Sequence, residues 1–142
     1  MNSVPLEDDE QAAVVQYCDI KGYPRFRVPN ETYTKSWSQK IKNKKLGVSS
    51  GVPDLFVIAH GQLKAIEMKR IRGGVTSQSQ KEWLERLNQV GIPAKVCRGA
   101  DEAIDFIENG GLQWQEQKKV ERKPQKRHKL GTEQIFINLL AL

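Results

Sequence analysis

Three residues in the middle of the chain, Asp54, Glu67 and Lys69, have side chains that could together support metal-assisted hydrolysis. Two neighbouring carboxylates repel each other unless a cation, a shared proton or a basic group lies beside them. Mg²⁺ favours such oxygen ligands, lowers the pKa of a bound water and polarises a phosphoryl oxygen. A lysine beside the ion can position that water for attack. The alternative is that Glu67 and Lys69 form only a surface salt bridge, because Glu-x-Lys is a common pattern.

A β-hairpin is the element that must bring these residues together. Apolar runs predict strands over residues 54–59 and 63–69, and Gly61 lies in the turn between them. Side chains alternate between the two faces of a strand, so one set of apolar residues is expected in a core. That set is Leu55, Val57, Ile66 and Met68.

The register of the hairpin decides whether the two carboxylates meet. Glu67 and Lys69 are two residues apart on one strand and therefore project from the same face. A two-residue loop, His60-Gly61, would place Asp54 directly opposite Glu67, with Cβ atoms roughly 5 Å apart. A three-residue loop would place Met68 opposite Asp54 instead, so the loop length stays open at this point.

Further helices and strands are predicted on both sides of the hairpin. Ser77-x-x-Gln80 has the spacing of a capping box and predicts the start of a helix. The apolar side of that helix is expected to hold Trp83, Leu84, Leu87 and Val90. The other elements are a helix over about residues 5–20 opened by Pro5, a strand at 25–28, a weak helix or mobile loop at 34–46, a strand at 93–97 and a helix at 101–109. This order predicts a mixed α/β fold with helices packed on a small sheet.

Four segments resemble a known nuclease family. They are Gly51-Val52-Pro53-Asp54-Leu55, Ile66-Glu67-Met68-Lys69, Ser77-Gln78-Ser79-Gln80 with Trp83 and Leu87, and Gly91-Ile92-Pro93-Ala94-Lys95-Val96. Together they are similar to the VRR-NUC branch of the PD-(D/E)xK nucleases, over about residues 7–107. The resemblance implies a restriction-endonuclease-like PD-(D/E)xK core: a small mixed sheet with a catalytic β-hairpin, flanked by helices.

The resemblance also implies roles for individual residues. Asp54, Glu67 and the main-chain carbonyl of Met68 are expected to bind Mg²⁺ or Mn²⁺, and Lys69 is expected to orient the attacking water. The family places a further acidic residue from the first helix at the site, and both Glu7 and Glu10 are candidates.

Two of these candidate roles have structural alternatives. The acidic residues Glu7 and Glu10 could merely stabilise the positive N-terminal end of the first helix. Gln80 is a further candidate for the site, although it could serve only as the capping-box partner of Ser77.

Basic residues predict contacts with DNA phosphates, which set affinity rather than sequence preference. The candidates are Lys35, Lys40, Lys42, Lys44, Lys45, Arg70 and Arg72. The net charge of +6 is concentrated in residues 118–129, which hold seven Lys or Arg and one Glu. This stretch predicts a second attraction to nucleic acid, with a solvated, disordered linker as the alternative.

The composition excludes several other classes of protein. The chain has 142 residues, 38% hydrophobic and 28% charged, and lacks an apolar run long enough for a membrane helix. Cys18 and Cys97 are predicted as reduced core residues, and the N-terminus does not resemble a secretory signal. We therefore expect a cytoplasmic protein with a nuclease domain over residues 1–111, followed by a basic linker and a short apolar end over residues 112–142.

The expected function is a Mg²⁺- or Mn²⁺-dependent endonuclease. Small stand-alone members of the family resemble Holliday-junction resolvases that act as homodimers, so branched DNA is the expected substrate. The alternatives are a nucleic-acid-binding module that has kept the nuclease fold without activity, and a sequence-specific restriction-type enzyme.

Overall fold

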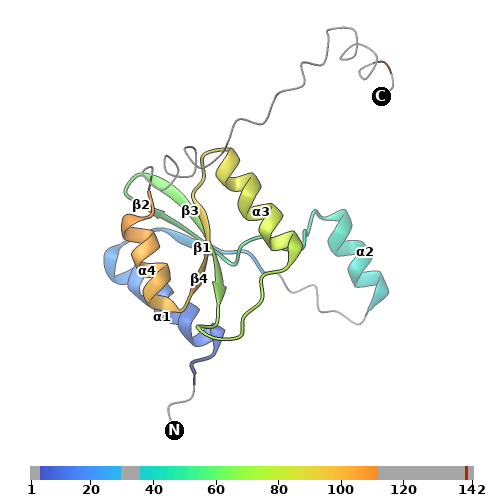
Figure 1. The fold of residues 1–142 in the computed structure, drawn as a ribbon. Helices are drawn as coiled ribbons and strands as arrows, with labels where there is room; N and C mark the ends of the chain where they lie inside the picture. Colours follow the sequence, from blue (N-terminus) through green and yellow to red (C-terminus); the bar gives the residue numbers. More distant parts are fainter. Residues whose placement is uncertain (1–3, 30–35, 112–139, 141–142) are drawn as a thin grey trace.

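The structure is a computed structural model that describes residues 4–29, 36–111 and 140. Helices and strands follow in the order α1 (Glu7–Lys21), β1 (Arg25–Arg27), α2 (Trp37–Lys45), β2 (Leu55–Ala59), β3 (Gln62–Lys69), α3 (Gln78–Gln89), β4 (Ala94–Arg98) and α4 (Ala100–Asn109) (Figure 1). The predicted mixed α/β fold class is confirmed.

The four strands form one mixed sheet in the order β1-β2-β3-β4. The pairs β1–β2 and β2–β3 are antiparallel, whereas β3–β4 is parallel. His60 and Gly61 form a two-residue turn with φ values of 53° and 70°, as expected of the tight turns that join twisted strands. Leu55 therefore pairs with Ile66, and the register that depends on a two-residue loop is confirmed.

Helices cover both faces of the sheet (Figure 1). On one face, Val14 and Cys18 of α1 and Phe106 of α4 pack against the predicted hairpin core. The members that the hairpin contributes are Leu55, Val57, Ala59, Ile66 and Met68. On the other face, Leu84 of α3 packs with residues of β2, β3 and β4, namely Phe56, Ala65 and Ala94. Cys18 and Cys97 are buried free thiols, as predicted.

The lysine-rich segment forms a short helix, α2, that buries none of its residues. The Ser36 side chain caps it by accepting a hydrogen bond from the Gln39 backbone N–H. Figure 1 shows α2 standing apart from the sheet and the three other helices. The lysine side chains of α2 are therefore exposed to solvent.

Two details differ from the predictions, and one buried charge was not predicted at all. Helix α1 begins at Glu7, with Leu6 as its N-cap, so Pro5 lies before the helix rather than at its first position. Val90 is 74% exposed, because α3 ends at Gln89 and the chain turns away there. Lys64, although charged, is 1% exposed. Its Nζ donates to the carbonyls of Phe106 and Ile107 at the C-terminal end of α4, where a positive charge is favourable.

None of the described helices is long and apolar enough to cross a membrane. The basic stretch at residues 118–129 and most of the apolar end, residues 135–139 and 141–142, lie outside the described residues.

Candidate active site

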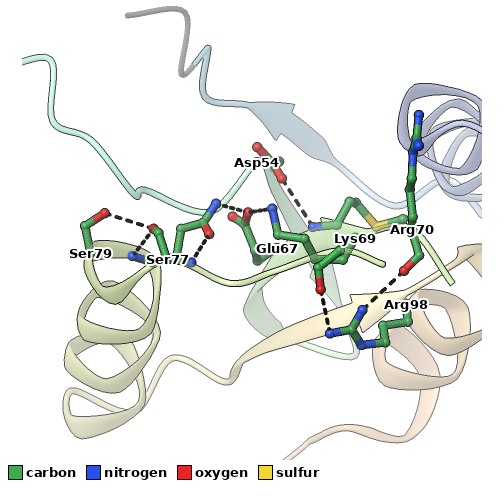
Figure 2. A network of polar contacts seen from close by, with 10 residues as sticks. Asp54, Glu67, Lys69, Arg70, Ser77, Ser79 and Arg98 are labelled. Carbon is green, nitrogen blue, oxygen red and sulfur yellow. Dashed lines mark hydrogen bonds and ion pairs between the residues drawn. The ribbon is translucent and has the colours of Figure 1, made fainter. Parts of the chain in front are cut away.

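The candidate site lies where β2 begins and β3 ends, because the two strands are antiparallel. Asp54 immediately precedes β2, and its Oδ2 accepts a hydrogen bond from the Met68 backbone N–H at 3.2 Å. The pair Leu55–Ile66 puts Asp54 one step further along, facing Glu67. Figure 2 shows Asp54, Glu67 and Lys69 gathered at this end of the hairpin. The two carboxylates and the amine therefore meet as the two-residue turn predicts.

Glu67 is the buried centre of the site, with 1% of its surface exposed. Its Oε1 accepts hydrogen bonds from Lys69 Nζ at 3.0 Å and from Gln80 Nε2. Its Oε2 is also buried and has no hydrogen-bond partner among the described residues. One oxygen of the carboxylate is thus fixed, and the other is left with unused acceptor capacity.

The pKa of Glu67 is raised to about 7, first by burial and then by the negative charge of Asp54. The hydrogen bond and charge of Lys69 oppose this rise, whereas Glu7 adds to it. Burial and a like charge both disfavour an ionised carboxylate. Burial and the charge of Asp54 together therefore outweigh the stabilisation that Lys69 gives to the ionised carboxylate.

Gln80 forms the capping box and also contacts Glu67. Its Oε1 accepts from the Ser77 backbone N–H at 2.8 Å, while its own backbone N–H donates to Ser77 Oγ at 3.2 Å. This reciprocal pair is the predicted capping box. The Nε2 group of the same side chain donates to Glu67. The start of α3 therefore holds Gln80 in place for its contact with the buried carboxylate.

The two candidate carboxylates of α1 have different surroundings. Glu10 Oε2 accepts from the Ala100 backbone N–H at 2.6 Å, so Glu10 caps the start of α4. Glu7, in contrast, lies near enough to Glu67 for its charge to raise the pKa of that residue. Glu10 therefore has a structural partner in α4, and Glu7 is the α1 carboxylate whose charge acts on Glu67.

The predicted metal ligands can be tested against the donor atoms present. Within the described part of the chain, no three His, Cys, Asp or Glu side chains are grouped to hold a metal ion. Mg²⁺, however, often uses only one or two carboxylates and keeps several waters. The buried, unpartnered Glu67 Oε2 and the repulsion by Asp54 are what such a cation would relieve. The N–H and C=O of a strand residue project to the same side of the strand, and the Met68 N–H donates to Asp54, so its carbonyl is expected on the side of Asp54. The donor set therefore fits a hard divalent cation.

The candidate DNA contacts lie on exposed parts of the chain. Lys40, Lys42, Lys44 and Lys45 are exposed on α2 or at its end, and Arg70 and Arg72 are exposed just after β3. Figure 2 shows the Arg70 side chain extending away from Glu67. Lys35 lies outside the described residues.

Gly51, which begins the segment leading to Asp54, packs against the start of α3. Its φ is +82°, and a Cβ there would lie 2.6 Å from the Ser79 carbonyl carbon and 2.8 Å from the Gln80 nitrogen. Both neighbours are backbone atoms, so they cannot move aside without shifting the helix start. This close approach holds the segment that carries Asp54 against the start of the helix that carries Gln80.

Gly51→Ala is expected to lower the free energy of unfolding by about 2 kcal/mol, because a left-handed residue with a Cβ is strained and the backbone overlap adds to that strain. Urea denaturation measures the effect. The matched control is Gly22→Ala, where φ is +70° and nothing lies within 4 Å of the added Cβ; it should cost about 1 kcal/mol. Equal losses at the two positions would contradict the packing argument.

Sequence analysis did not identify two contacts around Lys69. Gly74 lies against the Lys69 stem, and Arg98 donates to the carbonyls of Arg70 and Gly74. The glycine pair at residues 73–74 is typical of a turn, but nothing in the sequence links that turn to an arginine on another strand.

Comparison with known proteins gives two similarities and one negative result. The sequence model of the VRR-NUC domain matches residues 10–101, a span that contains Asp54, Glu67, Lys69 and Gln80 but not Glu7. A solved structure described as "VRR_NUC domain protein" is 25% identical to this chain, with a TM-score of 0.62. The similarity covers 79% of this chain and 92% of that one. The search of curated proteins found no match.

Proposed function

The chain belongs to the VRR-NUC domain family, and we propose that this nuclease-type domain is a metal-dependent endonuclease that hydrolyses phosphodiester bonds in DNA. The observation that carries the proposal is the buried Glu67 carboxylate, which faces Asp54 and has Lys69 Nζ 3.0 Å from one of its oxygens. Burying a carboxylate that faces a second, half-buried one is unfavourable by itself. Carboxylates with a pKa perturbed in this way are concentrated at functional sites.

The ligands proposed for Mg²⁺ or Mn²⁺ are Asp54, Glu67 through Oε2, and the Met68 carbonyl. When bound, such an ion would supply an acidified water and polarise a phosphoryl oxygen. Lys69 is 12% exposed at its side chain and is oriented by Glu67, so its ammonium can hold a water by hydrogen bonding. Gln80 fixes the Glu67 carboxylate from the other side. We assign Glu7, rather than Glu10, to the edge of the site.

DNA binding is proposed to involve the exposed lysines of α2 together with Arg70 and Arg72. Four lysines and no acidic residue lie on or next to this helix, which gives it a charge complementary to the phosphate backbone. Such contacts hold the substrate without reading its sequence.

We further propose that branched DNA, in particular a four-way junction, is the preferred substrate and that a homodimer acts on it. A two-fold dimer would present two identical sites to two strands, which suits paired cuts across a junction. The second candidate function is binding without catalysis. The exposed lysines of α2 would suffice for binding. Binding alone, however, gives no reason for the buried Glu67 to lie beside Asp54 and Lys69.

The test is cleavage of end-labelled DNA by the full chain. Linear duplex, flap and four-way DNA are each incubated with Mg²⁺, with Mn²⁺ and with EDTA. The proposal expects cutting only with a divalent metal, and faster cutting of the four-way DNA than of the linear duplex. Binding of every substrate without cutting in either metal would favour the binding module. A single discrete cut in plasmid DNA would instead indicate a restriction-type enzyme.

A further inference from the structure

Arg98, at the end of β4, holds a loop that neither the sequence nor the family similarity connects with it. Its Nη2 donates to the Gly74 carbonyl at 2.9 Å, and its Nη1 donates to the Arg70 carbonyl at 3.3 Å. These carbonyls lie at the two ends of the turn that follows β3. Figure 2 shows the guanidinium group reaching the Arg70 carbonyl. One planar side chain therefore bridges both ends of the loop, as the fixed fork of an arginine allows.

The same loop covers the stem of Lys69. A Cβ on Gly74 would lie 3.1 Å from Lys69 Cβ and 3.3 Å from its Cδ, so the loop backbone packs directly on the aliphatic part of the lysine. Lys69 and Arg98 are paired across β3 and β4, and the Gly99 N–H donates to the Lys69 carbonyl at 3.1 Å. The main chain of Lys69 is thus fixed by β4, and its side chain is confined by the loop that Arg98 holds.

We propose that Arg98 is a positioning residue for the reaction: it holds loop 70–74 over Lys69 and so keeps the Lys69 ammonium at Glu67. This inference rests on the proposed nuclease function. Four single bonds separate the Lys69 backbone from its amine carbon, so the ammonium position depends on what confines the stem. Without the loop, the ammonium would leave Glu67 for solvent more often, because long side chains gain rotamer freedom when released.

The proposal differs from a phosphate-binding role for the same arginine. In the structure the guanidinium of Arg98 is used in holding two carbonyls of its own chain. A positioning role predicts a loss in kcat with KM preserved, since a misplaced group in the site impairs the chemical step. A phosphate contact predicts the opposite: weaker binding and a salt dependence of the Kd that is smaller by about one counterion.

The experiment compares Arg98→Ala and Arg98→Lys with the wild type on the DNA that the wild type cuts best. Arg98→Ala is expected to lower kcat about 10-fold with KM within about twofold. Arg98→Lys should recover part of the loss, because one ammonium can reach one carbonyl but cannot bridge two. Hydrogen exchange of the amides in residues 71–76 should quicken in Arg98→Ala with or without DNA. The control is Lys95→Ala, on the same strand but facing α4, where Lys95 pairs with Glu102 at 2.8 Å.

The outcomes separate this inference from the proposed function. A wild type that cuts no DNA in either metal overturns the nuclease proposal, and with it any positioning role in cleavage. An active wild type with unchanged kcat in Arg98→Ala overturns the inference alone. A loss confined to KM and the salt dependence also overturns it, in favour of a phosphate contact. Unchanged hydrogen exchange in the loop would show that Arg98 does not hold it.

Discussion

Asp54→Asn should lower kcat for DNA cleavage by at least about 100-fold while leaving the Kd for DNA within about threefold, the scale on which removing one electrostatic group impairs an active site. The carboxylate faces Glu67 and is one of two acidic side chains proposed to hold the metal. In the wild type the Met68 N–H donates to Asp54 Oδ2 at 3.2 Å. The asparagine side chain keeps an oxygen that can accept the same hydrogen bond. The local fold is therefore expected to survive. Single-turnover cleavage and a separate binding assay measure the two quantities.

The matched control for this variant is Asp19→Asn. Asp19 lies near the end of α1 and pairs with Arg25 at 3.0 Å, away from the hairpin end that carries the site. The same change of charge there should leave kcat within about twofold, since exposed pairs contribute little. Cleavage by Asp54→Asn at the wild-type rate would remove Asp54 from the proposed metal site and undermine the endonuclease proposal.

The hairpin is the part of the site that the sequence predicted best, for a simple geometric reason. A strand has a period of two, and a two-residue turn fixes the register completely. Once His60-Gly61 is accepted as the turn, the meeting of Asp54 and Glu67 follows from counting. The capping box was predictable in the same way, because Ser77 and Gln80 are neighbours along the chain and their contact is local.

Contacts between distant elements were not predictable from local patterns. Lys64 shares its strand face with the core residues Ile66 and Met68, but the partners that satisfy its buried charge are two carbonyls at the end of α4. The choice between Glu7 and Glu10 depends on where the start of α4 lies, since Ala100 takes Glu10 as its cap. Arg98 acquires its role only because the turn after β3 folds back beside β4. Each of these depends on tertiary packing that spacing along the chain does not encode.

A measurement of stability against pH would test the electrostatics of the site without any substrate. The pKa of Glu67 is raised from 4.5 to about 7 in the folded chain, with burial as the largest cause and Asp54 as the second. Between these two values the folded state binds a proton that the unfolded state has released. The free energy of unfolding therefore falls as pH rises through this window, and the loss is complete above pH 7.

Glu67→Gln removes this titration, so the variant should gain stability relative to the wild type by about 3 kcal/mol between pH 4.5 and pH 8 in EDTA. Urea denaturation of both proteins at the two pH values measures the change, and comparing the two differences cancels any constant effect of the substitution. Glu85→Gln, on the exposed side of α3, shows what the same replacement does at a solvent-facing position.

Mg²⁺ at pH 8 should stabilise the wild type and not Glu67→Gln, since a ligand stabilises only the state that binds it. If the wild type were less stable than Glu67→Gln by the same amount at both pH values, the pKa of Glu67 would not be raised in the folded chain. Repulsion between Asp54 and Glu67 would then no longer support a cation site.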